Sequence, residues 1–327
     1  MTSTTRQRST NRTPRSTPDG ALAVAADPAF VCTPEVERVA SRASVYLEAG
    51  YPVHLSGPAG TGKTTLAFHV AAQRGRPVSL LHGNEAFTGN DLLGSDRGYR
   101  RSAVVDNYIH SVLKTEESLD VTWVDHRLTT ACRDGHTLIY DEFNRTRAEA
   151  NNILLSILEE GILAAPSASG GHQMVHPQFR LILTSNPAEY AGVHRAQDAL
   201  LDRLITIRCD HYDAETESRI VAAGSDLSEA DAGRVVRLVR ALRALRAEPG
   251  PPTVRGALAL ARVASRAGAR VDPGDETFLA MAWDVLGGAT VDLGDGERPL
   301  SREEFDALAA DVVPARVKKT RPRQRAA

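Results

Sequence analysis

One eight-residue stretch constrains the fold more than any other: GPAGTGKT, residues 57–64. It fits the pattern G-x-x-x-x-G-K-[ST], with an apolar strand-like segment (53–56) before it and a helix-like segment (63–73) after it. In that context the glycines let backbone N–H groups curl around phosphates at a helix N-terminus. The alternative, a glycine-rich turn with an ordinary surface lysine, leaves the flanking strand and helix unexplained. The motif therefore predicts a nucleotide phosphate site in an α/β sheet.

Each polar group of this loop has an expected task. Lys63 is placed to reach the β- and γ-phosphates, and the hydroxyl of Thr64 to coordinate Mg²⁺. The sequence contains no N-K-x-D segment for recognising guanine, so ATP is the expected nucleotide. The residues expected to surround its phosphates are Gly57, Pro58, Ala59, Gly60, Thr61, Gly62, Lys63, Thr64 and Thr65.

Two further strand-like segments end in polar residues. TLIYDE (137–142) ends in Asp141 and Glu142, and FRLILTSNP (179–187) contains Asn186. Since ligands bind at the carboxyl ends of strands in such sheets, Asp141 is predicted to hold Mg²⁺ and Glu142 to deprotonate the attacking water. Asn186 is predicted to position that water or to contact the γ-phosphate. The plainer alternatives are a pair of solvated acids and a turn-forming asparagine before proline.

The pattern along the chain predicts two domains and two tails. Strand-like and helix-like segments alternate over 29–210, which is typical of an α/β domain with a parallel sheet covered by helices. Over 211–311 only helical patterns remain, which predicts a small all-helical lid domain. The ends, 1–28 and 312–327, are basic and lack apolar periodicity, so we expect disordered tails there.

Composition restricts the remaining possibilities. Lys and Arg total 39 against 41 for Asp and Glu, a balance that argues neither for nor against a polyanionic partner. The cysteines Cys32, Cys132 and Cys209 lack metal-ligand spacing, which is typical of inert thiols in a reducing cytoplasm. No apolar run is long enough to span a membrane, so we expect a cytoplasmic protein without a membrane partner.

The order of these motifs resembles the AAA+ P-loop ATPases: strand, GPAGTGKT, strand, DE, strand, TSNP, then a helical domain. DEFNRTRAEANNILLSILEEG (141–161), followed by an insertion, resembles the MoxR branch of that family. Together with residues 30–94 it is similar to the GvpN family of gas vesicle proteins. One departure is Asn84, where that family's pattern leads us to expect aspartate. The resemblance covers about residues 29–210.

The resemblance implies an ATP-hydrolysing protein that assists gas vesicle assembly or remodelling. Such a protein works as a ring, commonly a hexamer, on other gas vesicle proteins, in the cytoplasm or at the vesicle. By motif position, Arg203 matches the arginine finger that reaches the γ-phosphate of a neighbouring subunit, and Arg255 matches the sensor arginine at the start of a lid helix. Arg195 lies near Arg203 in sequence and could exchange roles with it. A surface ion pair is the plainer explanation for each.

Two other functions stay open at this point. In one, nucleotide binding only orders the assembly, and the chain is a minor structural component of the vesicle. In the other, the chain is a DNA-associated motor whose basic tails bind phosphates, although nothing in the sequence resembles a dedicated DNA-binding fold. We rank the ATP-driven remodelling enzyme first and the DNA-associated motor last, so nucleic acid is not an expected partner.

Overall fold

The computed structural model describes residues 15–16, 22–24, 27–105, 115–165, 171–186, 198–245, 252–287 and 300–314. These residues fall into two compact units. The first comprises, as far as described, Met1–Asp27, Ala40–Ser56 and Lys63–Arg208, and the second Pro28–Val39, Gly57–Gly62 and Cys209–Ala327. The chain therefore passes between the two units more than once, for the last time between Arg208 and Cys209.

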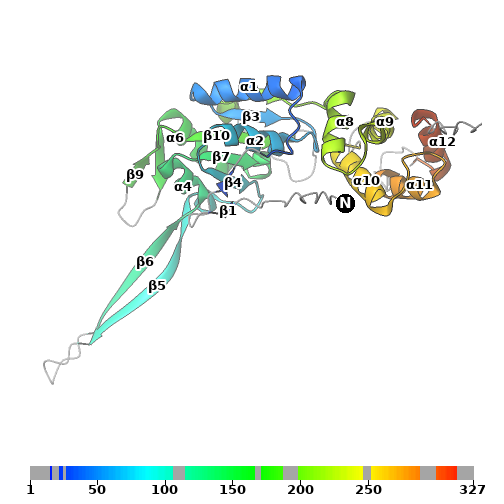
Figure 1. Ribbon diagram of the computed structural model, residues 1–327. Coiled ribbons are helices and arrows are strands. Elements are labelled where there is room, and N and C mark those ends of the chain that lie inside the picture. Colours follow the sequence, from blue (N-terminus) through cyan, green and yellow to red (C-terminus); the bar gives the residue numbers. More distant parts are fainter. Residues whose placement is uncertain are drawn as a thin grey trace, which may run out of the picture. The chain divides into compact units, whose positions relative to one another are not determined.

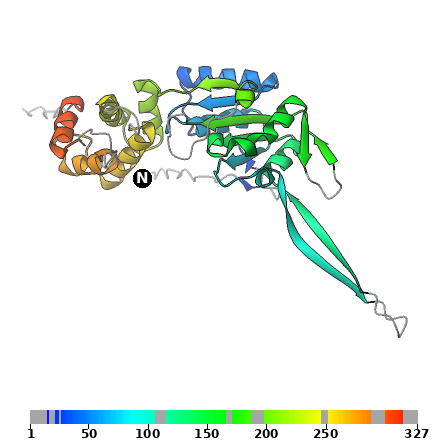
Figure 2. The ribbon, with the colours of Figure 1, turned by 180° about the vertical axis from the view of Figure 1, so that it is seen from behind.

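A parallel sheet forms the centre of the first unit (Figures 1 and 2). Its five parallel strands lie in the order β4–β7–β10–β3–β11. Their bounds are β3 (Val53–Ser56), β4 (Val78–His82), β7 (Thr137–Asp141), β10 (Arg180–Ser185) and β11 (Ile205–Arg208). Strands β3, β7 and β10 coincide with the strand-like segments predicted from the sequence. Because β10 lies between β7 and β3, the ends of the three motif-bearing strands are neighbours.

Two very short strands extend the sheet at the β4 edge. These are β1 (Arg15–Ser16) and β2 (Leu22–Ala23), which pair with each other and, through Leu22 and Val78, with β4 in an antiparallel sense. They lie within the stretch for which the sequence predicted only a basic tail.

Successive side chains of a strand point to opposite faces of the sheet, and both faces here are apolar. Helices therefore cover both faces. On one face Leu138 and Tyr140 of β7 and Leu181 and Leu183 of β10 form a core with α4 and α6. Helix α2 packs against β3, β7 and β10. The helices are α1 (Pro34–Glu48), α2 (Lys63–Gln73), α3 (Gly89–Leu93), α4 (Arg127–Asp134), the 3₁₀ helix η1 (Phe143–Arg145), α5 (Ala148–Asn151), α6 (Ile153–Glu159) and α7 (Asp198–Leu201). Helices α5 and α6 are consecutive, with only Asn152 between them.

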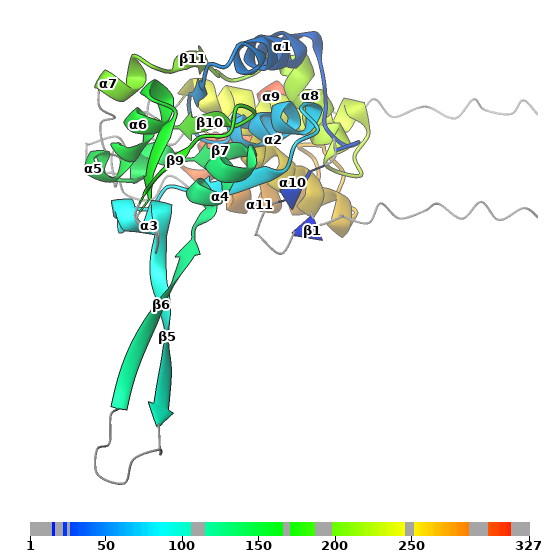
Figure 3. The same ribbon diagram turned by 90° about the vertical axis from the view of Figure 1, so that its left-hand side faces the viewer.

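Two hairpins project from this unit. Strands β5 (Gly94–Val105) and β6 (Thr115–Asp125) pair in an antiparallel sense and extend away from α3 and α4 (Figure 3). Strands β8 (Ile162–Ala165) and β9 (Gly171–Met174) form the second hairpin.

The second unit is helical, as expected. Its elements are α8 (Ala214–Ala223), α9 (Glu229–Leu245), α10 (Val254–Ala267), α11 (Glu276–Ala282), the π-helix η2 (Trp283–Gly287) and α12 (Arg302–Val312). Three helix starts are capped: Asp213 and Asp275 accept from backbone N–H groups, and Ser301 forms a capping box with Glu304. In the described part of the chain, no helix has the length and apolar character needed to cross a lipid bilayer.

Candidate functional site

Asp141 lies at the carboxyl end of β7 and is held by two hydroxyl groups. The Oγ1 of Thr64, at the start of α2, donates to Asp141 Oδ1 at 2.7 Å, and Thr184 Oγ1 of β10 donates to the same oxygen at 2.5 Å. The ring of His82, at the end of β4, lies 3.5 Å from Oδ2. The predicted magnesium residues Thr64 and Asp141 are thus in direct contact, and Thr184 joins them.

Glu142 follows Asp141 but has a different environment. Its backbone lies in the left-handed region, φ 52° and ψ 43°, the only positive φ among described residues other than glycine. Such a conformation costs about 1 kcal/mol or more in a residue with a Cβ and is concentrated at functional sites. Its N–H donates to Thr184 Oγ1 at 2.9 Å. The carboxylate is 47% exposed and lies 3.4 Å from Nε of Arg145.

Asn186, at the end of β10, is buried and adjoins the residues after Glu142. The side-chain amide of Asn144, in η1, donates to the backbone carbonyl of Asn186 at 3.3 Å. The end of β10 and the turn after β7 are therefore joined twice, through Thr184 and through Asn144. Hydrogen bonds therefore link the backbone around Glu142, the predicted base, to that of Asn186, the residue predicted to position the water.

The phosphate loop is held by close packing in the second unit. A Cβ on Gly57 would lie 1.9 Å from the carbonyl oxygen of Cys209, so that position accepts only glycine. Gly60 has φ +72°, and its Cβ would lie 2.4 Å from Oγ1 of Thr253, the residue before α10. Arg255, the predicted sensor arginine, is the second residue of α10 and is exposed. It thus lies two residues beyond the packing contact of Gly60.

Arg203, the predicted arginine finger, follows α7 in the first unit. Its guanidinium forms an ion pair with Glu159 of α6 and donates to the carbonyl of Ala199. This ion pair is what the plainer explanation expected, and an arginine finger would have to exchange it for phosphate. Arg195 lies outside the described residues.

The donor set suits Mg²⁺ and phosphate. A hydroxyl and a carboxylate oxygen in contact are the ligand types that Mg²⁺ takes, and it keeps waters in its other positions. Lys63, half-buried, begins α2 directly after the loop, so a cation stands at a helix N-terminus whose own dipole favours anions. Lys63, Thr64 and Asp141 therefore fit the magnesium–nucleotide pair that the motifs predict.

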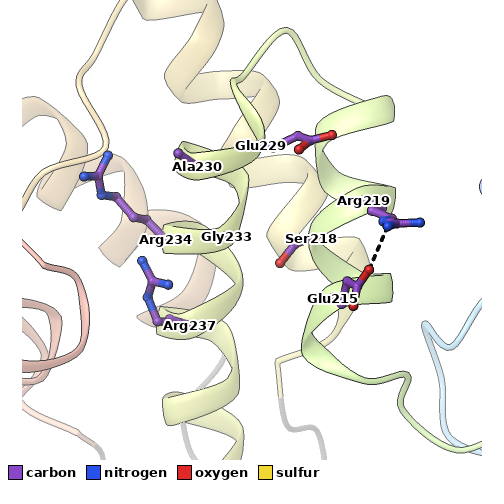
Figure 4. A pocket seen from close by; sticks show the side chains of 8 residues that line it. All are labelled: Glu215, Ser218, Arg219, Glu229, Ala230, Gly233, Arg234 and Arg237. Atoms are coloured by element: carbon purple, nitrogen blue, oxygen red, sulfur yellow. Dashed lines mark ion pairs between the residues drawn. The ribbon is translucent and has the colours of Figure 1, made fainter.

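A pocket of about 450 Å³ lies elsewhere, between α8 and α9 of the second unit (Figure 4). None of the residues predicted from the motifs lines it. Arg219 of the rim pairs with Glu215 at 2.7 Å, and Arg234 pairs with Asp231 at 2.6 Å. These ion pairs satisfy much of the charge around the pocket.

Sequence reasoning missed Thr184. It lies two residues before Asn186 in the same strand end, so its signal was a hydroxyl in TSN next to a predicted catalytic strand. Only the pairing of β10 with β7, which places Leu183 opposite Tyr140, shows that this hydroxyl reaches Asp141. The role of Arg145 as the partner of Glu142 was likewise not predicted.

Comparison with known proteins agrees with the motif order. A family model described as "AAA domain (dynein-related subfamily)" matches residues 52–204. "Gas vesicle ATPase GvpN" of Ancylobacter aquaticus is 47% identical over 259 residues, which cover 79% of this chain and 72% of the relative. "Gas vesicle ATPase GvpN1" of Halobacterium salinarum is 49% identical over 214 residues, 64% of this chain and 62% of the relative.

A more distant similarity reaches the MoxR branch. "Protein CbbQ" of Hydrogenophilus thermoluteolus is 26% identical over 193 residues, 58% of this chain and 66% of that protein. The match to the halobacterial relative spans less than two thirds of that relative's length. The resemblance that the motifs indicated is confirmed.

Proposed function

Since the chain belongs to the GvpN family of gas vesicle ATPases, within the AAA+ proteins, we propose that it hydrolyses ATP to assist gas vesicle assembly or remodelling. The substrates are ATP and water, and Mg²⁺ is the required metal. Other gas vesicle proteins are the proposed targets, and the proposed location is the cytoplasm and the vesicle surface.

One observation carries the proposal: adjacent carboxylates at the end of β7 have different partners. Asp141 is buried against the hydroxyls of Thr64 and Thr184, whereas the carboxylate of Glu142 is about half exposed. The first arrangement suits a metal-holding acid and the second an acid that meets water. Bound Mg²⁺ would neutralise charge on the phosphates, and Thr64 and Asp141 are the residues that would hold it.

Glu142 is the proposed general base. To accept a proton from water its carboxylate must leave Arg145, and an exposed ion pair of this kind is worth only about 0–1 kcal/mol. The left-handed backbone at Glu142 sets the direction of its side chain, and the N–H bond to Thr184 holds that backbone. Asn186 is proposed to orient the water or the γ-phosphate, and Lys63 to bind the phosphates.

The assembly proposed is a ring, commonly a hexamer in this family. A charge supplied in trans would complete each site only when subunits close on one another. Arg203 is the proposed arginine finger, and its release from Glu159 would accompany ring closure. Arg255, at the start of α10, is the proposed sensor through which the helical unit responds to nucleotide.

Two variants test whether hydrolysis matters for vesicles. Cells that carry Glu142→Gln as their only copy should fail to make normal vesicles, because the variant binds ATP without activating water. Lys63→Ala should fail as well, through loss of phosphate binding. Normal vesicles with Glu142→Gln but not with Lys63→Ala would contradict the proposal and support a component that ATP binding merely orders.

A further inference from the structure

A buried histidine lies behind the proposed site. His54 is in the middle of β3, 5% exposed, between the apolar residues Val53 and Leu55. Its Nε2 lies 2.8 Å from Oγ of Ser185 in β10, and its Nδ1 lies 3.0 Å from Oγ1 of Thr206 in β11. One ring therefore joins three neighbouring strands in the order β10–β3–β11.

Both ring nitrogens of His54 have a hydroxyl partner. A serine or threonine hydroxyl can donate or accept, so Ser185 and Thr206 can complement either neutral tautomer of the ring. Ser185 Oγ also lies 3.4 Å from Ser56 Oγ. Both nitrogens of a neutral ring are satisfied, as a buried polar side chain requires. These two hydrogen bonds fix the orientation of the ring between its neighbouring strands. An apolar side chain of similar size would make no such bonds.

The atoms that His54 contacts are next to the proposed catalytic groups. Ser185 directly precedes Asn186, which is proposed to orient the water or the γ-phosphate. The His54 and Phe143 rings also pack in a T-shaped arrangement, with centroids 5.3 Å apart and an interplanar angle of 89°, and Phe143 directly follows Glu142. A single buried side chain therefore contacts the residue that precedes Asn186 and the residue that follows Glu142, the proposed base.

We infer that His54 is a positioning residue for ATP hydrolysis, which sets the spacing of Glu142 and Asn186 through Phe143 and Ser185. The inference rests on the proposed function. Its physical basis is that hydrolysis depends on placement of water and phosphate to within a fraction of an ångström, whereas nucleotide affinity depends on the phosphate loop. His54 should therefore influence kcat more than ATP affinity.

The test compares substitutions that preserve or remove the Ser185 bond. His54→Leu should lower kcat roughly ten-fold or more while the Kd for ATP stays within about two-fold. His54→Gln, whose amide can both donate and accept, should recover part of that loss. Ser185→Ala removes the same bond from the other side and should resemble His54→Leu, so the question is decided even if His54→Leu does not fold. Thr206→Val, which keeps the bond between His54 and Ser185, should lower kcat less than His54→Leu does.

A double-mutant cycle separates positioning from general destabilisation. If His54 acts through Asn186, His54→Leu should lower kcat much less in an Asn186→Ala background than in the wild type. Full, multiplicative losses in that background would overturn the inference, as would unchanged kcat in folded His54→Leu and Ser185→Ala proteins. The wild type then still hydrolyses ATP and the proposed function stands; absence of hydrolysis by the wild type would instead refute the proposed function.

Discussion

Two buried carboxylates, one in each unit, have opposite kinds of partner. Asp141 in the α/β unit accepts from the hydroxyls of Thr64 and Thr184 and lies near an exposed imidazole. Glu217 in the helical unit, 1% exposed, pairs with the guanidinium groups of Arg240 at 3.2 Å and Arg243 at 2.8 Å. Hydroxyls orient a carboxylate without neutralising its charge, whereas arginines do both.

The difference suggests which acid serves a ligand and which serves the fold. A buried charge is costly unless it is compensated, and Glu217 receives its compensation within the chain. The hydroxyl groups that bind Asp141 satisfy its hydrogen bonds but leave its negative charge uncompensated, so this charge is available to a cation. We therefore expect substitutions of Asp141 to change catalysis and those of Glu217 to change stability.

The largest effect is expected for Asp141→Asn. The amide oxygen can still accept from both hydroxyls, so the fold should remain, but the negative charge that would hold Mg²⁺ is lost. We expect kcat/KM for Mg-ATP to fall by roughly 100-fold or more, with a thermal unfolding midpoint near that of the wild type. A variant with near wild-type activity would remove Asp141 from the metal site.

Glu217→Gln should have the opposite profile. Removing one partner of a buried ion pair leaves the arginines uncompensated, which costs about 3 kcal/mol; this is the low end of the usual range, because the Arg240 side chain is 40% exposed. Chemical denaturation would measure the loss. Hydrolysis per folded molecule should stay within about two-fold of the wild type. A large rate loss without destabilisation would break the comparison.

His54 extends the comparison to pH. Burial lowers the pKa of the His54 imidazole from its ordinary value of 6.5 to about 4, so the folded chain protonates this ring less readily than the unfolded chain does. The stability that the neutral His54 ring contributes to the folded state is therefore complete above pH 6.5 and is lost as the pH falls toward 4. The loss amounts to about 3 kcal/mol at most. In the His54→Leu variant, the difference in unfolding free energy between pH 7 and pH 4.5 should be smaller than in the wild type.

The sequence predicted those features that are local in the chain. The strand, GPAGTGKT and α2 follow one another, and Asp141 with Glu142 ends an apolar run, so pattern and chemistry sufficed. The helical unit was recognised because its apolar residues recur at helical spacing. Its buried Glu217 was not recognised, because the arginines that pair with it, Arg240 and Arg243, lie on another helix, α9.

Contacts between distant strands could not be read in the same way. His54 and Ser185 lie 131 positions apart, and nothing in either segment indicates the other until strand order and register are known. The left-handed backbone of Glu142 is equally hidden, because it results from the bond to Thr184 and the turn into η1. Sequence thus locates the reacting groups, whereas their orientation depends on pairing.

The most direct test of the account is the rate of ATP hydrolysis by purified Glu142→Gln, measured with its ATP affinity in the presence of Mg²⁺. The account predicts an affinity within about two-fold of the wild type and a kcat lower by roughly 100-fold or more, because the phosphate and metal groups remain and the base is gone. A Glu142→Gln protein that hydrolyses ATP at the wild-type rate would contradict it.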